Sequence, residues 1–216
     1  MEFNKFINIH TDKTAIICGC GQSLNLIKDR VDILNNENII TIGVNDVAKL
    51  FTPTYTVVVD SPNRFTNNRN LLITKSSSYI FTQIVDWKIE SGKKVLFKLG
   101  LKSKLENLYD KNNIIDYSNN SPYMACIIAY KMGCHTIALI GVDFTLNHFY
   151  AEDGEHNLIK ANRLNEINND YINLYNAFKI KNVNLYNLSE NSKVLGIPKL
   201  NINEILKIHT NNESNN

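Results

Sequence analysis

Short runs of apolar and β-branched residues alternate along the chain with longer stretches in which apolar residues recur every three or four positions. The apolar runs predict strands over residues 14–18, 39–44, 55–59, 78–82, 94–98, 114–117, 136–140 and 183–187. The helical spacing predicts helices over residues 23–34, 122–132, 158–180 and 202–208. This alternation is typical of α/β proteins, so we expect a Rossmann-like fold, a mostly parallel sheet with helices on both faces.

The pattern indicates a single domain with two short polar ends. Residues 1–13 are mostly polar and are expected to form an N-terminal extension. Residues 14–208 carry all the predicted elements and form the domain, while residues 209–216 are expected to be a flexible tail. Neither an internal repeat nor a linker divides the sequence, and 216 residues is an ordinary size for one α/β domain.

Composition gives no support for several classes of partner and location. With 44% hydrophobic and 20% charged residues the chain is ordinary for a globular protein, and its net charge of +2 gives no field that favours nucleic acid. No apolar run approaches the ~18 residues of a membrane span, and the N-terminus lacks the apolar stretch of a signal peptide, so we expect a cytoplasmic protein. The cysteines form no Cys-x-x-Cys pair and are expected to be buried thiols rather than zinc ligands: Cys18, Cys20, Cys126 and Cys134.

Polar residues follow four of the predicted strands. The first strand ends at residues 19–21, the second at Asn45, the third at Asp60, and the strand over 136–140 ends close to Asp143. Turn chemistry alone makes any one of these positions polar. In an open parallel sheet, however, the carboxyl ends of the strands lie along one edge, where ligands bind. The coincidence across four strands predicts a ligand site at that edge.

The glycine turn at 19–21 differs from the best-known phosphate-binding motifs. A glycine turn between a strand and a helix lets a phosphate approach the backbone and the helix N-terminus. Here the third glycine of the dinucleotide fingerprint is missing, and the second strand ends at the amide Asn45, with Asp46 one residue later. No Gly-Lys-Ser/Thr follows the turn either. A nicotinamide-dependent dehydrogenase and a P-loop enzyme are therefore disfavoured.

Three segments resemble those of the bacterial lipooligosaccharide sialyltransferases. The first is AIICGCGQSL at residues 15–24, and the second is the block at 121–144, which contains SPYMAC and ends in IALIGVDF. The third runs from NLYNLS at residue 184 to residue 193. The same patterns occur in a wider superfamily with motility-accessory-factor glycosyltransferases and archaeal pterin pyrophosphokinase-like proteins. The resemblance spans most of the chain between residues 14 and 206.

The resemblance implies a nucleotide-binding fold and an activated donor such as CMP-sialic acid. Residues of the glycine turn would line the phosphate or ribose, Asn45 would contact the donor, and Ser121 would lie near the sugar carboxylate or phosphate. The donor-binding residues that these motifs imply, with Asp60 added from the strand ends, are Gly19, Cys20, Gly21, Ser23, Asn45, Asp60, Ser121 and Asp143.

The resemblance also implies candidate catalytic residues. Glycosyl transfer needs a base that takes the proton of the acceptor hydroxyl, and histidine suits this role near neutral pH. The family's general-base position falls near Asn165 in this chain, so the nearest imidazoles are His148, our first choice, and His156, our second. Tyr150 matches a tyrosine that touches the leaving phosphate, which it would stabilise together with backbone N–H groups of the glycine turn.

Departures from the family pattern keep two alternatives open. Cys20 replaces an asparagine, and Pro122 replaces a glycine and removes a backbone N–H group. One alternative is a pyrophosphokinase-like enzyme that uses ATP, with Mg²⁺ held by Asp46, Asp60 and Asp143. The other is a nucleotide-binding module without turnover.

The main hypothesis is a glycosyltransferase that needs no metal or other cofactor, since the chain has no Asp-x-Asp motif. Its partners would be a nucleotide-sugar donor and a glycan or lipooligosaccharide acceptor. Peripheral membrane association and a homo-oligomer are further expectations of this hypothesis.

Overall fold

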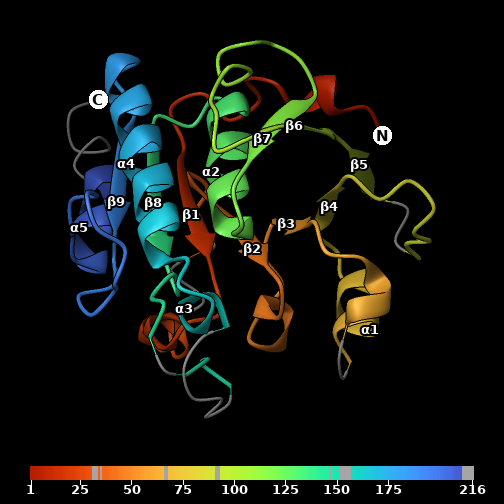
Figure 1. Cartoon of the computed structure of the whole chain (residues 1–216), viewed down its shortest axis with the longest axis horizontal. Helices are drawn as coiled ribbons and strands as arrows, with labels where there is room; N and C mark the ends of the chain where they lie inside the picture. Colours follow the sequence, from red (N-terminus) through yellow and green to blue (C-terminus); the bar gives the residue numbers. More distant parts are fainter. Residues whose placement is uncertain are drawn as a thin grey trace.

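A seven-stranded, fully parallel sheet forms the centre of the protein in the computed structural model (Figure 1). The structure describes residues 1–30, 34, 36–65, 68–90, 93–145, 147–150 and 157–210. In spatial order the strands are β5 (Lys94–Leu96), β4 (Tyr79–Thr82), β3 (Tyr55–Val58), β2 (Ile39–Val44), β1 (Thr14–Cys18), β8 (Thr136–Ile140) and β9 (Asn184–Asn187). The expected parallel α/β architecture is confirmed.

The central strands are apolar throughout because both of their faces are covered. Every residue of β1 and of β2 is buried. Thr14 at the start of β1 pairs with Ile39 on one side and with Thr136 on the other. Strands buried on both faces read as continuous apolar runs rather than alternating ones, which is why these segments stood out in the sequence.

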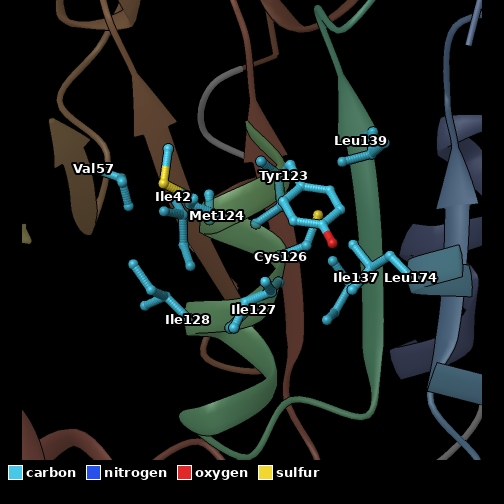
Figure 2. Packing of buried hydrophobic residues seen from close by; sticks show 14 of the residues in the cluster. Ile42, Val57, Tyr123, Met124, Cys126, Ile127, Ile128, Ile137, Leu139 and Leu174 are labelled. Carbon is cyan, nitrogen blue, oxygen red and sulfur yellow. The ribbon is translucent and has the colours of Figure 1, made fainter. Parts of the chain in front are cut away.

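Helices cover both faces of the sheet, as expected. On one face, α2 (Ser121–Lys131) packs on β1, β2, β3 and β8, and α4 (Leu164–Ile180) packs on β9. Figure 2 shows Tyr123, Met124 and Ile127 of α2 among side chains of the sheet and Leu174 of α4. The other face is covered by α5 (Ile202–Thr210) and by 3-10 helices over Gln22–Ile27 and Val47–Lys49.

The smaller elements lie at the ends of the sheet and beside it. They are α1 (Arg69–Thr74), α3 (Asn157–Lys160), 3-10 helices at Phe3–Phe6 and Pro62–Arg64, and the strands β6 (Lys98–Lys102) and β7 (Ile114–Tyr117). Strands β6 and β7 pair with each other in a separate two-stranded parallel sheet. Among the described helices, none is long and apolar enough to cross a membrane.

Three elements differ from the sequence prediction. The strand expected at 94–98 is divided, since Leu96 ends β5 in the main sheet and Lys98 begins β6 in the small one. The helix expected over 158–180 is interrupted by a turn at 161–163, where Asn162 adopts a φ of 55° that no α-helix allows. The helix expected over 23–34 begins as a short 3-10 helix, Gln22–Ile27, instead of an α-helix, and residues 31–33 of the expected span lie outside the described residues.

The N-terminal segment is part of the domain and not the polar extension that we expected. Phe3 and Phe6 are 2% and 6% exposed and lie in the core on the α2 side of the sheet. The Asn8 and His10 N–H groups donate to carbonyls at the end of α2 and just after it, and His10 Nε2 lies 2.6 Å from the hydroxyl oxygen of Tyr55. The two buried phenylalanines and these hydrogen bonds together anchor the segment. Residues 211–216 of the expected tail lie outside the described residues, and residues 209–210 continue α5.

Phe6→Ala tests whether the N-terminal segment carries folding energy. The Phe6 ring packs edge-on against Tyr79 and Phe81, with centroids 5.3 and 5.1 Å away. We expect the free energy of unfolding in urea to fall by about 3 kcal/mol because the substitution leaves a cavity in the core. Ile9→Ala, at a position that is 45% exposed in the same segment, is the control and should change it by less than about 0.5 kcal/mol. Equal, small effects of both substitutions would mean that the segment is a dispensable extension.

Candidate functional site

A cleft opens where the strand order reverses. Strands β1 to β5 follow one another to one side, whereas β8 and β9 lie on the other side of β1. The crevice at such a switch point, beyond the carboxyl ends of the strands, is where open α/β sheets bind ligands. Here it holds a cleft of about 400 Å³, which we call the switch-point cleft. The predicted site residues that line it are Gly19, Cys20, Gly21, Asn45, Asp60, Ser121, Asp143 and His148.

The glycine turn is built for contact between two backbone segments. The Gly19 N–H donates to the Ile140 carbonyl and the Gly21 N–H to the Gly141 carbonyl, both at 2.7 Å. A Cβ atom on Gly19 would lie 2.4 Å from the carbonyl oxygen of Gly141, so a side chain would force the two turns apart. The two amide donors that we expected to face a phosphate are therefore used inside the protein.

Asp143 connects the turn after β8 to the start of the 3-10 helix Gln22–Ile27. Its Oδ2 accepts from the Ser23 N–H at 2.7 Å, and its Oδ1 accepts from the Ser23 hydroxyl at 2.6 Å. The Ser23 Oγ in turn accepts from the Gly141 N–H at 2.7 Å. Asp143 is only 3% exposed, and both of its carboxylate oxygens are occupied. Ser23 therefore supports the wall of the switch-point cleft without lining it.

Asp46, at the carboxyl end of β2, is the centre of a buried charged network. Its Oδ2 accepts from the Arg69 guanidinium, through Nε at 3.0 Å and a second nitrogen, and from the Tyr150 hydroxyl at 3.1 Å. Lys49 Nζ lies 3.3 Å from Oδ1. Burial by itself would raise the pKa of the Asp46 carboxyl, but Arg69, assisted by Lys49 and Tyr150, holds that pKa below its ordinary value.

The segment 147–150 lies against the glycine turn. The Phe149 N–H donates to the Cys20 carbonyl at 2.9 Å, and His148 forms a β-bridge with Gly21. The His148 ring stacks on the Tyr150 ring, with centroids 5.3 Å apart and planes 11° from parallel. His148 thus lines the cleft, whereas the Tyr150 hydroxyl donates to Asp46 and Tyr150 is not among the residues that line the cleft. His156 lies outside the described residues.

The cysteines are buried thiols, as expected. All four are unpaired and buried, and burial raises the pKa of the Cys20 thiol to about 12. Cys20 Sγ accepts from the Asp46 N–H at 3.3 Å, so this residue connects the turn after β1 to the end of β2. In the part of the chain that the structure describes, no three His, Cys, Asp or Glu side chains gather in a group that could hold a metal ion.

The N-terminus of α2 brings unused donors to the cleft. Asn120 caps the helix, since its Oδ1 accepts from the Tyr123 N–H at 3.2 Å and from the Tyr171 hydroxyl at 3.1 Å. Its Nδ2 is buried and has no partner, although Asn120 is only 7% exposed and lines the cleft. The N–H of Ser121, the first helical residue, has no acceptor within the helix, and the helix dipole makes this end positive.

Sequence reasoning identified Ser121 but missed Asn120, Arg69 and Lys49. Asn120 had a readable signal, because an asparagine directly before Ser-Pro at the start of an apolar helix is a typical N-cap. Arg69 and Lys49 had none, because only the folded chain brings them to Asp46.

Solved structures share this fold, although no family model matches the chain and no curated protein matches it in sequence. The sialyltransferase CST-II, solved with a trisaccharide acceptor and CMP, is 18% identical; the match covers 87% of this chain and 86% of that one, with a TM-score of 0.52. CstII from Campylobacter jejuni, solved with the substrate analogue cytidine-5'-monophosphate, is 19% identical, with coverages of 89% and 86% and a TM-score of 0.53. The resemblance to lipooligosaccharide sialyltransferases that the motifs indicated therefore extends to the fold.

Asp46→Asn tests the buried network. We expect the free energy of unfolding at pH 7 to fall by about 3 kcal/mol, because Arg69 would lose its charged partner. Since the pKa of Asp46 is lower in the folded protein, its contribution is complete above the ordinary pKa of 3.8 and is lost as the pH falls through the folded value. Urea unfolding should show that the difference in the free energy of unfolding between this variant and wild type is smaller at acid pH than at pH 7.

Asp29→Asn, at an exposed position, is the matched control and should be neutral at both pH values. A difference between the Asp46→Asn variant and wild type that is equally large in acid would contradict the assignment.

Proposed function

We propose that the protein is a glycosyltransferase that moves a sugar from a nucleotide-activated donor, such as a CMP-sugar, to a glycan acceptor. The observation that carries this proposal is the switch-point cleft, where the N-terminus of α2 and the unpartnered Nδ2 of Asn120 meet the ends of β1, β2, β3 and β8. The similarity of the fold to sialyltransferases that were solved with CMP supports it.

The anionic part of the donor would bind at the α2 N-terminus. An unpaired buried donor costs about 1–3 kcal/mol, and a phosphate or carboxylate oxygen beside Asn120 Nδ2 would remove that cost. The Ser121 N–H and hydroxyl would supply two further donors at the positive end of the helix dipole. The proposal therefore has the anion bind at α2 and not at the glycine turn, whose Gly19 and Gly21 N–H groups are already bonded to carbonyls.

His148 would act as the general base from the wall of the same cleft. It would take the proton of the acceptor hydroxyl while the acceptor oxygen bonds to the anomeric carbon of the donor sugar. The bond from that carbon to the phosphate oxygen would break at the same time. The nucleotide would leave with the electron pair, and its developing negative charge would be stabilised by the donors around Ser121.

The engaged carboxylates weigh against the magnesium-dependent alternative. A pyrophosphokinase-like site would need Asp46, Asp60 and Asp143 as oxygen ligands. Both oxygens of Asp143 accept from Ser23, and Asp46 is paired with Arg69 and Lys49, so only the exposed Asp60 could bind an ion without breaking internal bonds. Transfer without a metal is therefore part of the proposal. Cytoplasmic location, membrane association and a homo-oligomer stay predictions from the sequence.

Thermal shift with CMP tests the donor site. We expect CMP to raise the Tm in the presence of EDTA, and UDP, GDP and ATP to raise it less at equal concentration. Asn120→Asp keeps the acceptor for Tyr123 but replaces the Nδ2 donor by an oxygen, so CMP should bind at least about tenfold more weakly. Asn184→Asp, at an exposed position at the amino end of β9, is the control, and this variant should bind CMP like wild type. Stabilisation by ATP alone, and only with Mg²⁺, would support the pyrophosphokinase alternative.

His148→Ala tests the base. With a CMP-sugar and a glycan acceptor, we expect kcat to fall by about 10²–10⁴-fold while CMP affinity stays within a factor of about two, because general-base catalysis acts on the acceptor. His135→Ala, at an exposed position in the turn before β8, should leave turnover unchanged. Unchanged turnover in His148→Ala would remove His148 from the mechanism, and CMP binding without transfer to any acceptor would favour the non-catalytic module.

A further inference from the structure

Tyr150 stacks on His148, the residue proposed as the general base. The two ring centroids lie 5.3 Å apart, and the ring planes are 11° from parallel. His148 lines the switch-point cleft, whereas Tyr150 is not among the residues that line it. A stacked neighbour restricts the directions in which an imidazole ring can point. Tyr150 therefore influences where the His148 ring nitrogens lie in the cleft.

Tyr150 is itself held by a buried carboxylate. Its hydroxyl donates to Asp46 Oδ2 at 3.1 Å, and Asp46 is only 3% exposed. Burial, together with the Asp46 carboxylate, raises the pKa of the Tyr150 phenol, so the hydroxyl keeps its proton and stays a donor. A phenol has a single O–H group, and here Asp46 accepts from it.

Two cations fix the position of this carboxylate and of the Tyr150 ring. Arg69, the first residue of α1, donates to Asp46 Oδ2 through Nε at 3.0 Å. Lys49 Nζ lies 3.3 Å from Asp46 Oδ1 and 3.8 Å from the centroid of the Tyr150 ring. At this distance an ammonium group is attracted to the face of an aromatic ring. Side chains from the end of β2, from the following 3-10 helix and from α1 thus hold one tyrosine.

The backbone of the segment 147–150 is fixed separately, by the glycine turn. The Phe149 N–H donates to the Cys20 carbonyl at 2.9 Å, and His148 forms a β-bridge with Gly21. The Phe149 ring meets the Tyr150 ring edge-on, with centroids 4.9 Å apart. The backbone bonds therefore place His148 at the cleft, and the Tyr150 ring restricts the orientation of its imidazole.

We propose that Tyr150 is a positioning residue that orients the His148 imidazole toward the acceptor hydroxyl, and that Asp46 and Lys49 hold Tyr150 in place for this role. The proposal rests on the proposed function, in which His148 takes the acceptor proton. It differs from the role that the motif match implied for Tyr150, because contact with the leaving phosphate would need the hydroxyl that donates to Asp46. Orientation matters for a base, since a displacement of about 1 Å can lower a rate by about 10²-fold.

Two substitutions of Tyr150 separate the ring from the hydroxyl. With a CMP-sugar and a glycan acceptor, we expect Tyr150→Leu to lower kcat by about 10–100-fold, while CMP affinity stays within a factor of about two. Tyr150→Phe keeps the stacked ring and loses only the bond to Asp46, so it should lower kcat by less than about fivefold. Tyr150 is 37% exposed, so neither change leaves a cavity in the core.

Tyr109→Phe is the matched control. It removes the hydroxyl of another exposed tyrosine, which donates to the Ala177 carbonyl, and it should leave kcat unchanged. Equal losses in Tyr150→Phe and Tyr150→Leu would mean that the hydroxyl itself acts on the substrate, and would overturn the proposal. A loss of CMP affinity that accounts for the loss of turnover would overturn it as well.

Combination with His148→Ala tests whether Tyr150 acts through His148. The double variant should have the same kcat as His148→Ala alone, because the ring that Tyr150 orients is then absent. A further loss of about tenfold or more in the double variant would overturn the proposal. Loss of turnover in His148→Ala but not in Tyr150→Leu would overturn only the positioning role. Wild-type turnover in His148→Ala would remove the base and the positioning role together, and absence of CMP binding to the wild-type protein would contradict the proposed function.

The NMR signals of the His148 ring give a readout that does not depend on turnover. In the full-length, ¹³C-labelled protein, the ring C–H signals of His148 are identified by their loss in His148→Ala. We expect these signals to move in Tyr150→Leu, which lacks the ring current of the stacked tyrosine, and to stay close to their wild-type positions in Tyr150→Phe. The signals of the exposed His135 should not move in either variant. His148 signals that are unchanged in Tyr150→Leu would overturn the proposal.

Discussion

The direct backbone contact between the turns after β1 and β8 is the constraint on which the site depends. Gly19 and Gly141 bring two turns so close that a Cβ on Gly19 would lie 2.4 Å from the Gly141 carbonyl oxygen, and one on Gly141 would lie 2.3 Å from the Gly19 carbonyl oxygen. Gly141 also has a φ of +69°, which glycine adopts at little cost. This contact joins the two halves of the doubly wound sheet. The switch-point cleft lies next to it, beyond the carboxyl ends of the strands. The glycines therefore serve the architecture first and a ligand only indirectly.

Charged groups near the cleft are mostly occupied in holding its walls. Asp143 fastens the turn after β8 to Ser23, and Asp46 fastens Arg69, Lys49 and Tyr150 to the end of β2. Asp60, the N-terminal end of α2 and the His148 ring also line the cleft, and the Nδ2 group of Asn120 there has no partner.

Much of the fold could be predicted from the sequence, because strands buried on both faces must be apolar along their whole length. Because these strands could be located, the polar residues at their ends could also be identified. Eight of the ten described candidate site residues line the switch-point cleft. Tyr150 and Ser23 are the two that do not, since a motif match gives a position along the chain but not the partner of a side chain. The N-terminal segment was misjudged because Phe3 and Phe6 lie among polar residues, and their burial needs the edge of the completed sheet.

The sequence by itself determined the parallel α/β class, the polar strand ends and the start of α2, because these follow from local periodicity and capping chemistry. Only the tertiary structure decided which donors are used up inside the protein. The pairing of Asp143 with Ser23 joins residues 120 positions apart, and the pairing of Asp46 with Arg69 joins residues 23 positions apart. It also decided that the Nδ2 groups of Asn120 and Asn187 stay unpaired, since that depends on every neighbour that packs around them.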